Sequence, residues 1–320
     1  MNVTTIVSRP TAAPKPPSRM VYANVTKGVL ERPMKILIYG EAGFAKSSFA
    51  AHAPRPIWLG GENGSDHLPV ARYPDPQSYE EVVEAIRDAR QHRDKHDTFV
   101  FDPLGFFEPF VEEKVRRDNG WATLEEPGYG RGPQAVFDQW RVLLHEIEQL
   151  YYAGMHIVII AHADKKTETS PDVETFDKYV IALKNQKAAH LLDRWCDYVL
   201  FVQQRIWTTK GKDKRFRGTT DGSLVMHATA MPYFRAKSRP ALPGTLPVSW
   251  RAFMEARAAV STRKKDLRSR VDELLLELND ESAAQQALDY IAEAPDDDTS
   301  RLEEVVNVLA NEIAKKDTQT

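Results

Sequence analysis

The chain has 320 residues, a formal net charge of −3, an apolar fraction of 42% and a charged fraction of 28%. This length suggests one large domain or two smaller ones, and the absence of an overall basic excess means that any nucleic-acid binding must be local. The single cysteine, Cys196, rules out an internal disulfide framework and favours a buried structural thiol in a reduced cytoplasmic setting. No apolar run approaches the roughly 18 residues of a membrane span, so we expect no membrane association.

Three regions differ in composition. Residues 1–30 include a proline-rich stretch and are predicted to form a disordered or extended arm. Strand and helix patterns alternate through residues 31–257, which predicts an α/β core with a mostly parallel sheet and helices on both faces. Residues 258–320 show helical periodicity without strand patterns, and we expect a small region of three short helices there.

The most informative stretch is Lys35–Ala51, which reads K-I-L-I-Y-G-E-A-G-F-A-K-S-S-F-A-A. An apolar strand, a glycine turn and a helix start follow one another, as in a phosphate-binding loop. The template G-x-x-x-x-G-K-[S/T] fits, except that Ala45 stands where the second glycine is expected. Backbone N–H groups and the helix N-terminus would hold the phosphates of ATP. We expect nucleotide contacts from Gly40, Glu41, Ala42, Gly43, Phe44, Ala45, Lys46, Ser47 and Ser48.

Three further polar residues, Glu62, Asp102 and His162, lie at the carboxyl ends of predicted strands, which is where ligands bind in such sheets. Lys46 would reach the β- and γ-phosphates, while Ser47 and Asp102, the latter ending the strand T-F-V-F-D, would hold Mg²⁺. Glu62 is the candidate general base, with a turn glutamate as the alternative interpretation. His162 would face the γ-phosphate, and a structural hydrogen bond is its alternative.

A set of motifs in fixed order resembles one known family over about residues 30–255. They are the phosphate loop with its following H-A-P-R-P-I-W-L, F-V-F-D-P-L at 99–104, G-Y-G-R-G at 128–132, I-I-A-H at 159–162 and A-K-S-R-P-A-L-P at 236–243. The chain is similar to phage-encoded AAA-type, RecA-like P-loop ATPases, including the Sak-group single-strand annealing proteins. The A-K-S ending of the loop also resembles MCM helicases and MoxR-type ATPases, so we expect Ala45 to be tolerated.

The resemblance implies an ATPase that uses Mg²⁺, assembles with itself and acts on single-stranded DNA in recombination. It assigns the catalytic glutamate to Glu62 and the γ-phosphate contact to His162. It places Lys237 and Arg239 at the nucleotide of a neighbouring subunit in a ring or filament. The family more often has an aspartate where this chain has Gly60. A single-strand-binding protein is an expected partner, and the host cytoplasm is the expected location if the protein is phage-encoded.

Three segments are candidates for holding DNA, because basic groups neutralise phosphates and aromatic rings stack on bases. The first is 128–132, the second is 165–179, which includes most of a loop predicted at 164–177, and the third is 210–217, the basic segment of a predicted hairpin. Their basic residues include Arg131, Lys165, Lys166, Lys210, Lys212, Lys214, Arg215 and Arg217. Each segment also fits an ordinary solvated loop. The alternative function is a nucleotide-dependent oligomeric loader or regulatory assembly module that does not act on DNA.

Overall fold

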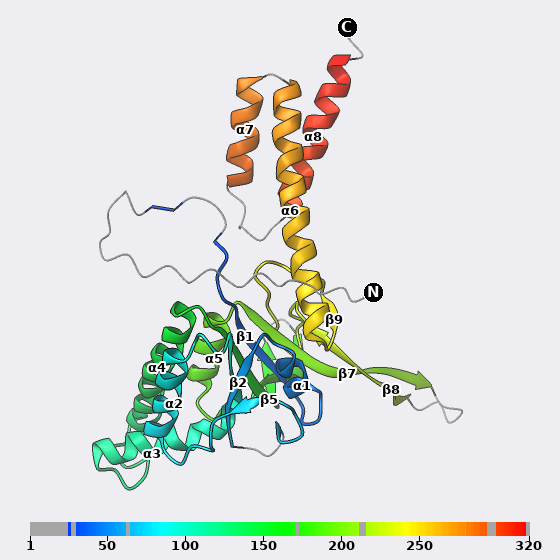
Figure 1. Cartoon of the computed structure of the whole chain (residues 1–320). Coiled ribbons are helices and arrows are strands. Elements are labelled where there is room, and N and C mark those ends of the chain that lie inside the picture. Colours follow the sequence, from blue (N-terminus) through cyan, green and yellow to red (C-terminus); the bar gives the residue numbers. More distant parts are fainter. Residues whose placement is uncertain are drawn as a thin grey trace.

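The fold is an α/β core that carries a helical extension (Figure 1). The computed structural model describes residues 25–26, 30–61, 65–170, 173–210, 216–278, 280–292 and 299–317. Within these residues the strands form one sheet in the order β3-β2-β4-β5-β1-β7-β8-β9, with β6 paired to β5. The strands are β1 (Lys35–Gly40), β2 (Pro56–Gly60), β3 (Ala71–Arg72), β4 (Thr98–Asp102), β5 (His156–Ser170), β6 (Val173–Ile181), β7 (Tyr198–Lys210), β8 (Phe216–His227) and β9 (Thr245–Pro247).

Strands β3, β2, β4, β5, β1 and β7 pair in parallel, whereas β6, β8 and β9 are added antiparallel. The predicted mostly parallel sheet is therefore confirmed. The helices are α1 (Lys46–Ala51), α2 (Tyr79–Gln91), the 3₁₀ turn η3 (Leu104–Phe107), α3 (Glu108–Asn119), α4 (Arg131–Tyr152), α5 (Gln186–Trp195), α6 (Trp250–Leu278), α7 (Glu281–Ala292) and α8 (Ser300–Asp317).

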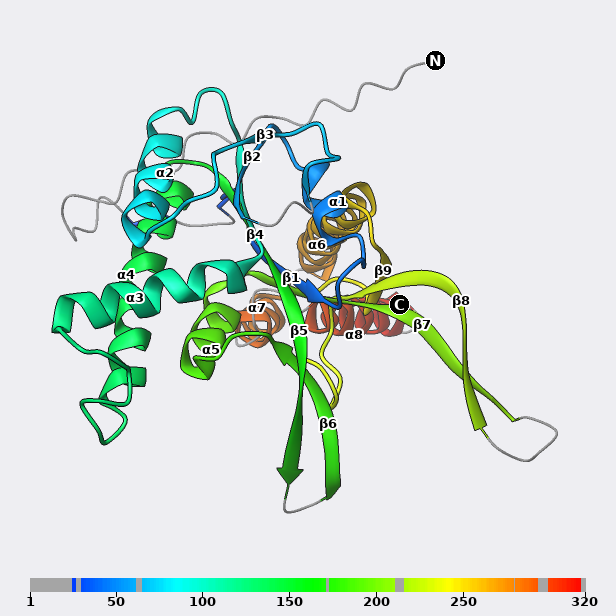
Figure 2. The same ribbon diagram turned by 90° about the horizontal axis from the view of Figure 1, so that it is seen from below.

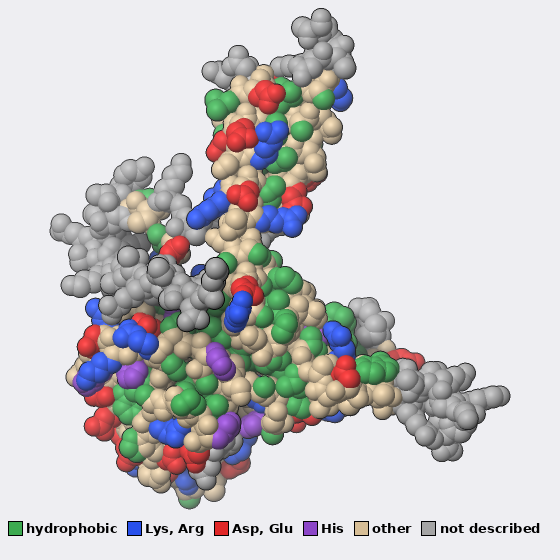
Figure 3. Space-filling model, turned by 45° about the vertical axis from the view of Figure 1, so that its right-hand side comes forward, with side chains coloured by type: hydrophobic (Ala, Val, Ile, Leu, Met, Phe, Trp, Pro, Cys, Tyr) green, Lys and Arg blue, Asp and Glu red, His purple; other side chains and the backbone are tan. Residues whose placement is uncertain are grey.

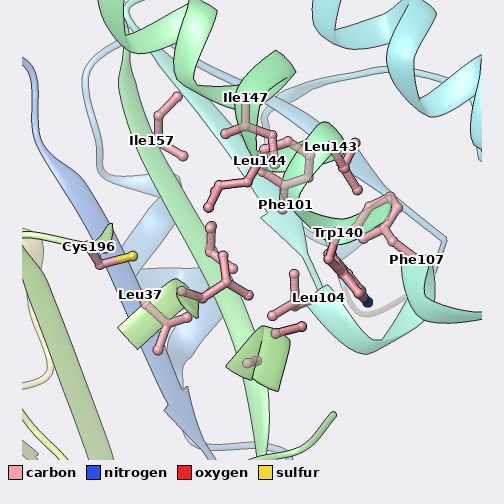
Figure 4. Packing of buried hydrophobic residues seen from close by; sticks show 14 of the residues in the cluster. Leu37, Phe101, Leu104, Phe107, Trp140, Leu143, Leu144, Ile147, Ile157 and Cys196 are labelled. Carbon is pink, nitrogen blue, oxygen red and sulfur yellow. The ribbon is translucent and has the colours of Figure 1, made fainter. Parts of the chain in front are cut away.

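Helices cover both faces of the sheet, as the sequence predicts. The side chains of β1 alternate between two buried clusters, since successive residues of a strand point to opposite faces. Leu37 and Tyr39 face a cluster made with α2, α3, α4 and α5, whereas Ile36 and Ile38 face one made with α1 and the start of α6. Figure 4 shows the first cluster, in which Trp140 and Leu143 of α4 pack toward the strands. Cys196 is buried there, and this burial raises the pKa of its thiol.

The segment predicted as a loop at 164–177 is instead the hairpin β5–β6 (Figure 2). Its threonines and charged residues are mostly exposed, so it lacks the apolar alternation that marks a half-buried strand. Strand β5 therefore does not end at His162 but continues to Ser170. The one hairpin that the sequence predicts is confirmed as β7–β8, and it also extends away from the sheet (Figure 2).

The first helix of the C-terminal region is longer than expected. Helix α6 is continuous over 29 residues, so the expected boundary at 257/258 lies inside it. It contains neither glycine nor proline, and its first turn is held to the core by Trp250 and Phe253. Both rings pack on Phe49 of α1, with centroid distances of 5.3 and 5.9 Å.

The far half of α6 packs with α7 and α8 around a small core of its own. Its buried members are Val271, Leu274, Leu278, Leu302, Val305 and Leu309. Acidic and basic side chains are mixed over the outer surface of this helical group (Figure 3). None of the helices in the described part of the chain combines the length and apolar character that a bilayer crossing requires.

A buried histidine makes the fold sensitive to acid. Burial lowers the pKa of His156 to about 4, and its Nδ1 accepts a hydrogen bond of 2.9 Å from the backbone N–H of Met34. Below pH 6.5 the unfolded chain therefore binds a proton at this residue that the folded chain does not bind. The contribution of neutral His156 to the unfolding free energy is therefore fully present above pH 6.5 and is lost as the pH falls toward 4.

We predict that His156 alone removes about 3 kcal/mol from the unfolding free energy between pH 6.5 and pH 4. Urea denaturation at steps across this range measures it. His156→Gln keeps a hydrogen-bond acceptor but does not titrate, so its stability should fall less steeply. His190→Gln, at an exposed residue, is the control and should follow the wild type. Parallel curves for wild type and His156→Gln would contradict the assignment.

Candidate nucleotide-binding site

The site begins at the carboxyl end of β1, where three parallel strands lie side by side. Gly40 pairs with His162 of β5 on one side and with Val202 of β7 on the other. A Cβ atom at Gly40 would lie 2.3 Å from the carbonyl oxygen of Val202. Only glycine fits this position without a backbone shift, and the chain can then turn directly into the loop that follows.

The loop of residues 41–45 leads into α1 with two residues in the left-handed region. Gly43 has φ 78°, and Ala45 has φ 53°. Ala45 is the N-cap of α1, and its carbonyl accepts the first helical hydrogen bond, from Phe49 N–H at 2.9 Å. Ala45 thus adopts the backbone conformation for which glycine is usual in this place.

Lys46 is the first residue of α1 and is only 6% exposed. Its Nζ donates to the carbonyl oxygens of Gly40 at 2.9 Å and Glu41 at 2.6 Å. The ammonium therefore lies against the inside of the loop, where a phosphate would exchange with these carbonyl partners. This is the position expected for the lysine of a phosphate-binding loop.

Ser47 of α1 contacts Asp102 of β4, although β5 separates β4 from β1, the strand that leads into α1. The Ser47 hydroxyl donates to Asp102 Oδ2 at 2.7 Å, and the indole Nε1 of Trp58 donates to the same oxygen at 3.2 Å. A hydroxyl and a carboxylate are oxygen ligands of the kind Mg²⁺ prefers. The described residues contain no group of three or more His, Cys, Asp or Glu able to hold a metal. Mg²⁺ here would thus take most ligands from phosphates and water, as is usual for this ion.

Glu62 lies outside the described residues, so its assignment as general base stays a prediction. The structure does describe the two glycines before it. A Cβ at Gly60 would lie 2.2 Å from the carbonyl oxygen of Asp102, and one at Gly61 would lie 1.9 Å from the ring of Phe106. An aspartate at position 60, as the resemblance noted above would favour, is therefore incompatible with this backbone.

His162 lies beside Gly40, at the edge where the phosphates are expected. Its carbonyl accepts a hydrogen bond of 2.9 Å from Ala182 N–H, and its residue is half-buried. Since β5 continues beyond it, His162 is a residue within a strand rather than at its end. Its contact with the γ-phosphate stays a prediction.

Lys237 lies away from the phosphate loop of its own chain. Lys237 pairs with Val199 near the start of β7, and its Nζ donates to the carbonyls of Asp193 and Arg194, the latter at 3.4 Å. Val199 is three residues before the carboxyl edge, about 10 Å along the strand. Desolvation lowers the pKa of the Lys237 ammonium. Arg239 is exposed, and a contact of either residue with a neighbouring chain stays a prediction.

The candidate DNA-binding residues fall into separate groups. Lys165 and Lys166 are exposed on the β5–β6 hairpin, with Lys165 Nζ 5.2 Å from the centroid of the Tyr179 ring. Arg131, also exposed, begins α4, which packs on the sheet face that α2, α3 and α5 also cover. Outside the described residues lie Lys212, Lys214 and Arg215, and so do the side chains of Lys210 and Arg217.

Two features define a P-loop NTPase core. The ammonium of Lys46 lies against the inside of a loop between strand and helix, and Ser47 is hydrogen-bonded to Asp102. The chain matches the model of the AAA domain family over residues 32–240, which is more than half its length. It therefore belongs to the AAA domain family, and this membership supports nucleotide binding and ATPase activity in general. No curated protein gives a significant match to the chain.

The left-handed Ala45 gives a prediction for stability. A left-handed backbone costs a residue with a Cβ about 1–2 kcal/mol, and glycine avoids this cost. Part of the benefit is offset because glycine increases the conformational entropy of the unfolded chain. We expect Ala45→Gly to raise the unfolding free energy by roughly 0.5–1 kcal/mol. Ala42→Gly, in the same loop but without a positive φ, is the control and should lower it. Chemical denaturation of both variants measures the difference, and destabilisation by Ala45→Gly would contradict the strain.

Proposed function

We propose that this protein hydrolyses ATP with Mg²⁺ and couples hydrolysis to binding of single-stranded DNA in phage recombination or strand annealing. One observation carries the DNA part of the proposal. Strands β5 and β7, which both pair with the phosphate-loop strand β1, continue beyond Gly40 as the hairpins β5–β6 and β7–β8. Both hairpins therefore extend from the edge at which the nucleotide would bind.

The β7–β8 hairpin has the composition that a single-stranded nucleic acid favours. Residues 210–217 read K-G-K-D-K-R-F-R, with five basic residues and one acidic residue. Basic side chains neutralise phosphates, while aromatic rings stack on bases of any sequence. On the described part of the same hairpin, Trp207 is 42% exposed and Ile206 is 65% exposed. These apolar side chains are available to a bound strand.

The chemistry at the phosphates needs little more than positioning and charge neutralisation. Mg²⁺ supplies charge neutralisation between the phosphate oxygens when it is bound. Lys46 would contact the β- and γ-phosphates, and Ser47 with Asp102 would hold the ion. Glu62 would orient the attacking water and accept its proton. Arg239, which is exposed, would act at the nucleotide of a neighbouring subunit in a homo-oligomer.

The first experiment measures ATP hydrolysis with and without single-stranded DNA over a range of protein concentrations. Stimulation by DNA, with a rate per subunit that rises with concentration, is expected. Lys46→Ala should abolish hydrolysis and is the control for contaminating ATPases. Concentration-dependent hydrolysis that is indifferent to DNA would contradict the DNA function and favour a nucleotide-dependent assembly module. A single-strand-binding protein can then be added as a candidate partner.

We predict that changing Lys210, Lys212, Lys214, Arg215 and Arg217 together to glutamine weakens DNA binding and lowers its salt dependence. If all five contact phosphates, the slope of log K against log[salt] becomes shallower by about 3–4 for single strands. The matched control changes Arg263, Lys264, Lys265, Arg268 and Arg270 of α6, which removes the same charge elsewhere. Fluorescence anisotropy of a labelled oligonucleotide at several salt concentrations measures both. Equal loss in the two variants would contradict a local DNA site.

A further inference from the structure

Trp58 contacts the candidate metal carboxylate from β2, the strand that precedes the predicted general base Glu62. It is the third residue of β2 and pairs with Val100 of β4, two residues before Asp102. Residues two apart on a strand share a face, so the indole and the carboxylate lie on the same side of the sheet. Trp58 is 1% exposed, and its Nε1 lies 3.2 Å from Asp102 Oδ2.

The same oxygen accepts from Ser47 at 2.7 Å, so two donors from different elements converge on Oδ2. An indole N–H is a donor only and a carboxylate is an acceptor, so this pair is matched in chemistry. Two contacts to one oxygen fix the rotation of the carboxylate about its Cβ–Cγ bond. Ser47 approaches from helix α1, whereas Trp58 approaches from the buried strand β2.

We propose that Trp58 is a positioning residue, which orients the Asp102 carboxylate for the Mg²⁺ that accompanies the nucleotide. The proposal rests on the Mg²⁺-dependent nucleotide binding put forward above. Ser47 would hold the ion through its hydroxyl and so give up its hydrogen bond to Asp102, whereas the indole N–H would still hold Oδ2. The carboxylate would then keep its orientation without the serine. Groups that orient a metal ligand through hydrogen bonds commonly change metal affinity by 10- to 100-fold when they are lost.

A second buried tryptophan offers a matched control. Trp140 of α4 is 3% exposed, and its Nε1 has no hydrogen-bond partner among the described residues. Trp140→Phe removes the same atoms as Trp58→Phe from a similarly buried place without touching Asp102. A difference between the variants in response to Mg²⁺ therefore reports the contact with Asp102 rather than the loss of an indole.

The test measures binding of a fluorescent N-methylanthraniloyl derivative of ADP, titrated with Mg²⁺ and also in EDTA. In Trp58→Phe, the Mg²⁺ concentration for half-maximal tightening should rise about 10-fold or more, with affinity in EDTA unchanged. Trp140→Phe should match the wild type in both. An unchanged Mg²⁺ response in Trp58→Phe, or equal weakening with and without Mg²⁺, overturns the positioning role. A wild type that binds the probe equally with Mg²⁺ and in EDTA overturns the proposed Mg²⁺ site as well.

A measurement on the unaltered ring covers the case in which Trp58→Phe does not fold. The indole ¹⁵N–¹H signals of the labelled protein are assigned by Trp→Phe substitution at the other tryptophans. Adding Mg²⁺ to the ADP-bound protein should move the Trp58 signal and leave the Trp140 signal in place. A Trp58 signal that does not respond to Mg²⁺ overturns the proposal.

Discussion

The hydrogen bond between Ser47 and Asp102 is the contact on which the arrangement of the site depends. The two residues come from β1–α1 and from β4, and β5 lies between these strands in the sheet. The carboxylate can meet the hydroxyl because α1 starts at the edge of the sheet where β1 and β4 both end. The order of strands, the left-handed loop and the length of β4 all contribute to this one 2.7 Å distance.

Much of this core could be predicted from local patterns. The apolar run before Gly40 and the K-S pair after Ala45 predict the loop, and T-F-V-F-D predicts the second strand of the site, because each pattern is contiguous. The contact of Trp58 could not be predicted in this way. Nothing in the sequence distinguishes its indole from the other apolar groups of β2, and its partner is 44 residues away.

The mistaken elements have a common physical cause, which is exposure. The hairpin β5–β6 is exposed to solvent over much of its surface, so most of its residues are polar, and such a sequence predicts a loop. Helix α6 joins a half held by the core to a half that packs with α8, and the polar run at 261–266 separates their apolar residues. Periodicity indicated only the second half. Sites shared between chains, such as the one expected for Arg239, leave little trace in the packing of a single chain.

The packing of Phe49 against Trp250 and Phe253 gives α6 a mechanical property. Phe49 lies three residues after Lys46, on the helix that begins at the phosphate loop. An unbroken helix of 29 residues is about 43 Å long. A tilt of about 5° at its base would therefore displace its far end by about 4 Å. A small movement of α1 beside the phosphates, if passed on through Phe49, would become a large one at the outer helices.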